Sequence, residues 1–399
     1  MTIDDKLLIS FPLGSGGPFH RLQSFLGLIR EESPMLGRRV LWAVALCWVP
    51  LLLLWWLQSN PALEVSESNP SASPLTHIPT YARFFVSLPL LIASEQAVKP
   101  YLETALRHAL TSGIVPPEEK PAFQSLLDKA LRWQDSWRVE LLLAVLAIIE
   151  AQGVATVMRA QGHDSWALTG SILTWAGTWY FWISKPFLQF LIFRWIYRIL
   201  IWWWVLLGMA RLRLVIKPAH PDGRGGLAFM GDSLQAFATL ALALSANVAG
   251  GVADYVVSES TGIAGLEGFI IGGTGAILLG LAVPLASFIK PMVRAKEGAL
   301  LNYEGMAQRY CQAFDEKWHK GRQETPITEN RPLPEFSSMT DMNAMVKGVR
   351  DMKTLPYTRQ GLISLVIAVM IPFLPVVAMA VPAENILKGI LHVLMGGIE

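Results

Sequence analysis

Residues 40–57 read VLWAVALCWVPLLLLWWL and contain no charged residue. A helix needs roughly 20 predominantly apolar residues to cross a hydrocarbon core of about 30 Å, so this segment predicts a transmembrane helix. The whole chain has the same character: 52% of its 399 residues are hydrophobic and 16% are charged, against roughly 25% charged in an ordinary soluble domain. The sequence therefore indicates an all-α, polytopic membrane protein whose main surroundings are the lipid bilayer.

Further apolar stretches follow at 79–97, 139–157, 166–209, 233–257, 266–289 and 361–381. The first of these is weak, because Arg83 and Glu95 bracket a short apolar core, and a re-entrant segment is the alternative to a span. The stretch 166–209 is long enough to cross twice. We expect about seven crossings, in which 166–209 crosses once and its Trp-rich first half lies in the membrane interface.

Positive charge decides between one and two crossings of that stretch. Five Lys and Arg precede residue 40, residues 58–82 have none, residues 210–232 have four and residues 290–360 have twelve. Because Lys and Arg accumulate in cytoplasmic loops, a single crossing places all three basic regions in the cytoplasm. We therefore expect a cytoplasmic N-terminus, an external C-terminus and no cleaved signal peptide.

The same pattern divides the chain into four regions. Residues 1–39 form a cytoplasmic N-terminal leader, and residues 40–289 form a transmembrane domain with a cytoplasmic helical insert at 102–138 and a loop at 210–232. Residues 290–360 form a cytoplasmic helical region, in which apolar residues recur at helical spacing between Leu300 and Trp318. Residues 361–399 form the last transmembrane helix and an amphipathic tail. We expect the cytoplasmic helices to pack together as one layer, with a basic face on anionic lipid headgroups as the alternative.

Small residues form ridges at four-residue spacing on two of the predicted helices. One ridge includes Ser245 and Ala249, and the other includes Gly268, Gly272 and Gly280. Such ridges let helix backbones approach closely in lipid. We favour packing of the two helices against each other as a hairpin, with a subunit contact or a pore lining as the alternatives.

Polar residues inside apolar stretches are costly and suggest function. The main candidates are Arg194, Arg198, Glu150 and Asn247. Arg194 and Arg198 lie one turn apart on one helix face, where a buried acid, Glu95 or Glu150, is expected to neutralise them. For Glu95 and Asp254 we favour a position at the interface, where side chains reach water.

The loop KPAHPDGRGGLAFMGD, residues 217–232, contains the most distinctive local motif. Its Pro and Gly residues and its Asp-Gly pair are typical of sharp turns, and Asp232 is expected to cap a helix that starts near Ser233. We favour a structural turn. The alternative is an anion or ligand site that uses His220, Asp222 and Arg224.

Motifs for enzymatic chemistry are missing from the sequence. Gly-Arg-Gly-Gly lacks the Lys-Ser/Thr of a phosphate-binding loop, the seven histidines have no zinc spacing, and no Gly-x-Ser-x-Gly nucleophile elbow occurs. A His-Pro-Asp triplet also marks the J-domain co-chaperones, but here an apolar Trp-rich span precedes it. We expect no catalytic residues, cofactor, metal or nucleic-acid partner.

Four segments together resemble an uncharacterised family of bacterial multi-pass membrane proteins that carry a His-Pro-Asp-x-x-Gly-Gly loop. They are SKPFLQFLIFRWIYRILIW (184–202), RLRLVIKPAHPDGRGGLAFMGD (211–232), YEGMAQRYCQAFDEKWHKG (303–321) and IPFLPVVAMAVPAENILKGIL (371–391). The resemblance covers roughly residues 80 to 395 and departs from the pattern at Lys185. It implies a helical fold in the bacterial inner membrane and assigns no activity.

Two functional hypotheses follow from these patterns, ahead of a third, a lipid-modifying or phosphate-handling enzyme that uses His220, Asp222 and Arg224. The small-residue ridges and the Arg pair favour a homo-oligomeric channel or transport protein for ions or small solutes. The alternative is a membrane-anchored signalling or scaffold protein whose cytoplasmic helices, chiefly residues 290–360, dock a protein partner.

Overall fold

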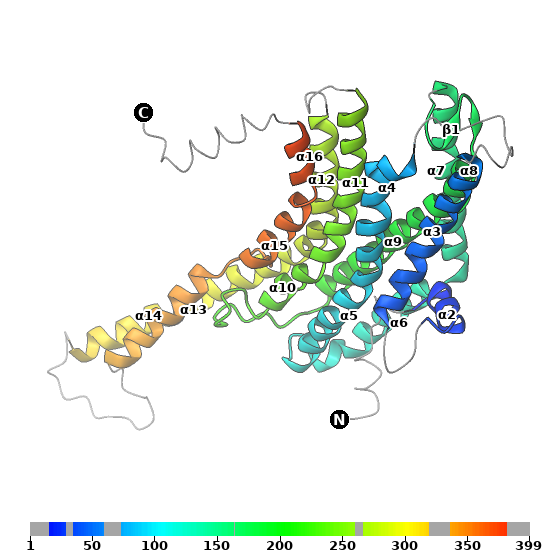
Figure 1. Ribbon diagram of the computed structural model, residues 1–399. Helices are drawn as coiled ribbons and strands as arrows, with labels where there is room; N and C mark the ends of the chain where they lie inside the picture. The colour runs from blue at the N-terminus through cyan, green and yellow to red at the C-terminus, as the bar shows by residue number, and fades with distance from the viewer. Residues whose placement is uncertain are drawn as a thin grey trace, which may run out of the picture.

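The computed structural model describes residues 16–28, 35–59, 73–162, 164–259, 266–318 and 336–380. Within these ranges the chain is almost entirely helical (Figure 1), which confirms the all-α class. The one sheet there is an antiparallel hairpin of β1 (Leu168–Thr169) and β2 (Ile172–Leu173). The α-helices are α2 (Pro18–Phe25), α3 (Leu36–Ser59), α4 (Ile78–Tyr81), α5 (Leu88–Thr111), α6 (Lys120–Gln134), α7 (Trp137–Gln161), α8 (Trp175–Trp179), α9 (Lys185–Arg211), α10 (Ala228–Ala236), α11 (Ala238–Glu259), α12 (Glu267–Ala282), α13 (Ile289–Trp318), α14 (Phe336–Asp351), α15 (Arg359–Met370) and α16 (Phe373–Ala380).

Five helical segments of the described chain are long and apolar enough to span a membrane. They are Leu36–Ser59, Trp137–Gln161, Trp175–Arg211, Ala238–Val256 and Glu267–Asp315. A bent pair, Arg359–Met370 with Phe373–Met379, makes a sixth if its halves form one span. These are the helices of a multi-pass membrane protein, and the total of about seven crossings stays a prediction.

The weak segment at 79–97 lies inside a continuous helical rod. A π-helical stretch, Ala82–Ser87, joins α4 to α5, and the chain does not reverse direction as a re-entrant segment would (Figure 1). The rod packs against α3, α10 and α11, and the Ser87 hydroxyl donates a hydrogen bond of 2.8 Å to the Ala243 carbonyl. The polar residues that interrupt its apolar pattern are tolerated because they form hydrogen bonds with neighbouring helices.

The long aromatic stretch at 166–209 combines two structures. Its first residues form the β hairpin, and the Thr174 hydroxyl then caps a helix by accepting a 2.9 Å hydrogen bond from the Gly177 N–H. From Trp175 to Arg211 the chain is a single helical rod of 37 residues, with a π-helical stretch at Tyr180–Ser184. From Trp175 onward the Trp-rich first half is continuous with the second half, and its position in the membrane interface stays a prediction.

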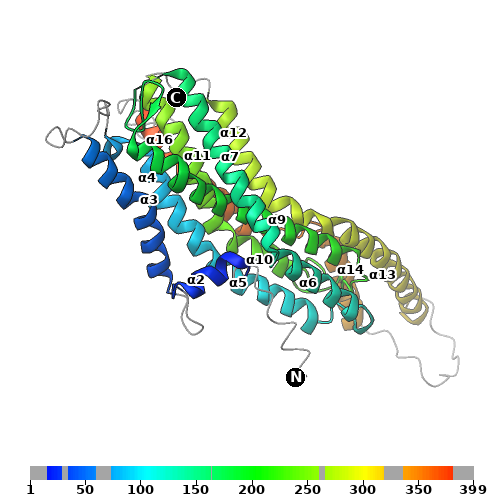
Figure 2. The same cartoon turned by 90° about the vertical axis from the view of Figure 1, so that its right-hand side faces the viewer.

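The basic regions gather at one end of the bundle. Helix α6, the end of α9, and helices α13 and α14 lie toward this end, whereas the β hairpin and α16 lie toward the other (Figures 1 and 2). The described parts of 102–138, 210–232 and 290–360 therefore lie toward the same end of the bundle, and their placement in the cytoplasm stays a prediction.

Helices α13 and α14 pack against each other and project away from the bundle (Figures 1 and 2). We call this pair the arm. A short 3-10 stretch, Val283–Phe288, joins α12 to the arm. Helices α2 and α6 lie beside the bundle rather than on the arm, and the packing of residues 1–39, 102–138 and 290–360 as one cytoplasmic layer stays a prediction.

The two small-residue ridges face different neighbours. On α11, Ser245 donates a hydrogen bond to the Val369 carbonyl of α15, and Ala249 packs with Phe373 and Val376 of α16. On α12, a side chain added at Gly268, Gly272 or Gly280 would meet nothing within 4 Å. Helices α11 and α12 do contact each other, but Gly273 makes the close approach, to Val248.

Candidate functional site

Five charged side chains from four helices form a buried cluster, which we call the arginine cluster. Glu95 of α5 lies at its centre: one carboxylate oxygen accepts hydrogen bonds from Arg194 Nη1 (2.7 Å) and Arg198 Nη1 (2.9 Å) of α9. The other oxygen accepts from Arg39 Nη2 of α3. Glu140 of α7 completes the cluster by accepting a 3.0 Å hydrogen bond from Arg194 Nε.

Helix α2 covers the arginine cluster. The Phe19 N–H donates to Glu140 Oε2 (2.6 Å), and Arg194 Nη2 donates to the Gly16 carbonyl (2.8 Å). The Phe19 ring lies 5.0 Å from the Arg194 guanidinium carbon, which adds a cation–π contact. The charged side chains of Glu140 on α7 and Arg194 on α9 thus hold the described part of the N-terminal leader against the bundle.

The cluster is enclosed rather than open to solvent. Glu95 is 6% exposed and Arg198 is 2% exposed, so the position at the interface that we favoured for Glu95 is wrong. The cavity among these side chains has a volume of about 10 Å³, close to the minimum for one water molecule. The cluster therefore cross-links α2, α3, α5, α7 and α9, and it has no room for an organic solute.

The remaining polar candidates lie elsewhere. Glu150 does not reach the Arg pair and instead accepts a 3.0 Å hydrogen bond from Lys185 Nζ. Asn247 is half-buried on α11. Asp254 has a side chain that is 51% exposed, and it lies 3.3 Å from His77 Nε2.

Asp222 organises the His-Pro-Asp loop, which we define as residues 217–227. Its carboxylate accepts hydrogen bonds from the backbone N–H groups of Arg224 (2.8 Å), Gly226 (3.1 Å) and Ala228 (3.1 Å). His220 Nδ1 lies 3.0 Å from the same carboxylate. Partial burial alone would raise the pKa of Asp222, but these hydrogen bonds hold it below its ordinary value.

This geometry favours the structural turn over the anion or ligand site. Its backbone N–H groups are the donors that an external anion would need, and the Asp222 carboxylate already occupies three of them. Helix α10 begins at Ala228, with Asp222 bonded to its first N–H, so our assignment of Asp232 as the cap is wrong. The loop has the geometry of the structural turn.

The His-Pro-Asp loop also holds the base of the arm. Arg224 Nη2 donates to the Tyr357 carbonyl (2.9 Å), and the Lys353 N–H donates to the Gly223 carbonyl (2.9 Å). Lys296 Nζ of α13 donates to the Met352 carbonyl at the end of α14 (2.7 Å). The loop near residue 224 and the segment that follows α14 (residues 352–357) are therefore held together where the arm leaves the bundle.

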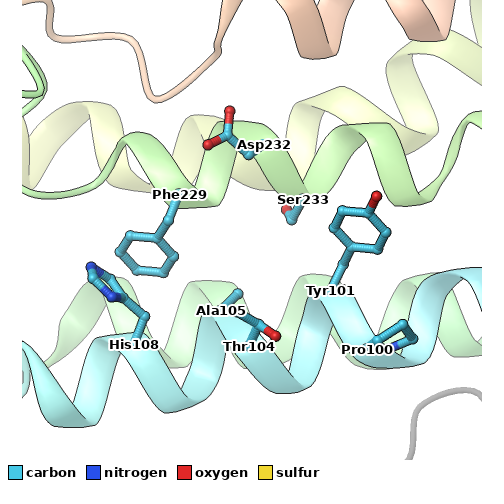
Figure 3. Close-up of a pocket in the computed structure, with 8 residues that line it drawn as sticks. All are labelled: Pro100, Tyr101, Thr104, Ala105, His108, Phe229, Asp232 and Ser233. Atoms are coloured by element: carbon cyan, nitrogen blue, oxygen red, sulfur yellow. The ribbon is translucent and has the colours of Figure 1, made fainter.

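A pocket of about 350 Å³ lies between α5 and α10, where Phe229 and Ser233 point toward α5 (Figure 3). The His108 and Phe229 rings meet edge to face, with centroids 4.6 Å apart. Its lining is mainly apolar, which suits a small apolar molecule better than a charged one. The lining residues are Pro100, Tyr101, Thr104, Ala105, His108, Phe229, Asp232 and Ser233.

Sequence reasoning found part of the arginine cluster. It placed Arg194 and Arg198 together and named Glu95 or Glu150 as their partner, of which Glu95 is the one that meets them. It missed Arg39 and Glu140, which stand at the edges of apolar stretches. The available signal was their position at the end of a predicted transmembrane span. A charged residue there faces either water or a neighbouring helix, so it is a candidate for an ion pair between helices. The pocket was missed as well, since its residues follow no motif.

Comparison with known proteins gives no relative: no family model, no curated protein and no solved structure matches this chain. In the part of the chain that the structure describes, no group of three or more His, Cys, Asp or Glu residues is placed to hold a metal ion.

Proposed function

We propose that this chain is a membrane-anchored platform that binds a protein partner through its arm, on the cytoplasmic side of the membrane. The observation that carries this proposal is the projection of α13 and α14 away from the bundle (Figures 1 and 2). The side is assigned from positive charge, which gathers at the end from which the arm leaves.

The arm exposes apolar side chains at a distance from the apolar bundle. Leu301 is 76% exposed, and Met306 and Met345 are 44% exposed each. Exposed Met residues suit adaptable protein contacts, because their side chains are flexible and polarizable.

The clamp at the base supports the same function. The hydrogen bonds of Arg224, Lys296 and Lys353 hold the arm at a defined angle to the bundle. A fixed arm presents its surface with little loss of conformational freedom on binding.

Photo-crosslinking in cells tests whether the arm binds a protein partner. We expect a photoreactive residue at Leu301, Met306 or Met345 to form one adduct with a defined protein, identified by mass spectrometry. The matched control is Leu142 on α7, an exposed apolar residue of a membrane-spanning helix, where we expect lipid adducts alone. Absence of a protein adduct at all three arm positions would contradict the proposal.

A homo-oligomeric channel is the second candidate, and one observation favours it. The glycine ridge of α12, formed by Gly268, Gly272 and Gly280, faces open space, as a helix interface with a second copy would require. Cysteine crosslinking at Gly272 tests the contact, and ion flux in liposomes tests conduction. A crosslinked dimer without flux would support assembly and reject the channel.

A further inference from the structure

The arginine cluster has more positive than negative charge. Among the described residues, three guanidinium groups face two carboxylates, which leaves a formal charge of +1 (3 − 2). Arg stays protonated in proteins, so loss of a proton does not remove this charge. Asp135, which accepts a hydrogen bond from Gly17 next to α2, is already paired with Arg21 and is exposed. Each Arg has a carboxylate partner, but a net charge that is buried in a medium of low dielectric constant is unfavourable.

Two guanidinium nitrogens of the cluster also have no acceptor. Within the described ranges, Arg198 Nη2 and Arg39 Nε have no hydrogen-bond partner, and both residues are more than nine-tenths buried. Both residues line the same cavity of about 10 Å³, together with Gln23 and Arg194. A buried donor without an acceptor costs free energy, because water that it bonded in the unfolded chain is not replaced.

We infer that the arginine cluster binds one monatomic anion, which in cells is chloride. An anion supplies both missing elements, the negative charge and an acceptor for the free N–H groups. A water molecule supplies the acceptor and leaves the charge uncompensated. The volume, near the lower limit for a single water-sized particle, excludes polyatomic anions such as sulfate or phosphate. A halide is somewhat larger than water, so its binding requires a small outward shift of the surrounding side chains.

The thermal stability of the full chain in detergent tests this inference. Chloride and bromide are compared with gluconate and sulfate at equal ionic strength. We expect the unfolding temperature to be higher in the halides by roughly 3 °C or more, with saturation as their concentration rises. Crystals grown in bromide should show an anomalous peak within hydrogen-bond distance of Arg198 and Arg39.

An isosteric substitution provides the matched test. Gln23 accepts a 2.9 Å hydrogen bond from Arg39 Nη2, so Gln23→Glu adds the missing negative charge without a change of shape. We expect the unfolding temperature of this variant to lose its halide dependence, whereas Gln312→Glu on the exposed surface of α13 retains it.

Two results would overturn the inference. The first is an unmodified protein that unfolds at the same temperature in all four anions. The second is a halide effect that persists unchanged in Gln23→Glu, which would place the halide elsewhere. If Gln23→Glu does not fold, the bromide peak in the unmodified protein decides, and its absence rejects the site.

Discussion

Glu95 shows how one residue can hold a membrane bundle together. Its two oxygens accept hydrogen bonds from three Arg side chains on α3 and α9. In a low-dielectric environment such a network stabilises only when each charge has its partners, and removal of the shared acid leaves several cations uncompensated. The position therefore tolerates substitution poorly.

We expect Glu95→Gln to lower the free energy of unfolding by about 3–5 kcal/mol, the usual effect of removing one partner of a buried ion pair. Thermal unfolding in detergent measures the change. Glu150→Gln is the matched control, because among the described residues Glu150 pairs with Lys185 alone and its side chain is 36% exposed. Equal losses in the two variants would contradict the central place of Glu95.

At the His-Pro-Asp loop, Asp222→Asn keeps the shape of the side chain and removes its charge. One amide oxygen replaces two carboxylate oxygens that accept from three backbone N–H groups. We expect a loss of about 1–3 kcal/mol in stability, because charge-assisted hydrogen bonds are replaced by fewer neutral ones. His220→Ala, at a more exposed position, should cost much less in the same unfolding measurement.

The ionised Asp222 also predicts a dependence on pH. The folded state holds the pKa of Asp222 below its value of 3.8 in the unfolded chain. Its contribution is therefore present above that value and is lost as the pH falls through the lower, folded pKa. We expect unfolding temperatures measured between pH 5 and pH 3 to fall less steeply in Asp222→Asn than in the unmodified protein. An unchanged slope would show that Asp222 is not the group responsible.

At the level of elements, close helix contacts depend on glycines outside the predicted ridges. A Cβ atom on Gly231 of α10 would overlap the Pro356 carbonyl oxygen and the Thr358 backbone nitrogen, and Gly361 of α15 lies against the Gly231 carbonyl. Helix α10 thus packs directly on the segment that leads into α15. Spacing within a single helix does not show this contact, because the two partners are far apart in the sequence.

Gly231→Ala should destabilise the fold by about 1–3 kcal/mol, since added atoms against a backbone force it to shift. Gly153→Ala on α7 is the matched control, because its added Cβ would meet nothing within 4 Å. We expect the control to unfold at the same or a slightly higher temperature, given the greater helix propensity of Ala. A neutral Gly231→Ala would mean that α10 and α15 separate easily.

For the whole molecule, the gathering of basic regions at one end predicts its orientation. We expect single cysteines placed in the His-Pro-Asp loop and on the arm to react with a membrane-impermeant maleimide only after the cytoplasmic side is opened. A cysteine at Gly170 in the β hairpin should react from the outside. Cys311 is replaced by Ser beforehand, because it lies on the arm. Labelling of both ends from the same side would contradict the topology.

The sequence by itself determined the class of the protein and its division into apolar and basic regions. A bilayer requires long apolar helices and biases positive charge to one side, so both features can be recognised from consecutive residues in the sequence. The turn character of Asp222 and its neighbours could be predicted for the same reason, since turn chemistry is local.

Tertiary structure alone decided which charges meet and which glycines make contacts. Arg39, Glu95, Glu140 and Arg198 come from four helices that are distant in the sequence, and Glu150 pairs with Lys185 rather than with the Arg pair. A local pattern shows the face on which a side chain lies, but not the helix that this face meets. That choice is made by packing of the whole bundle, which buries each charge only where an opposite charge from another helix can reach it.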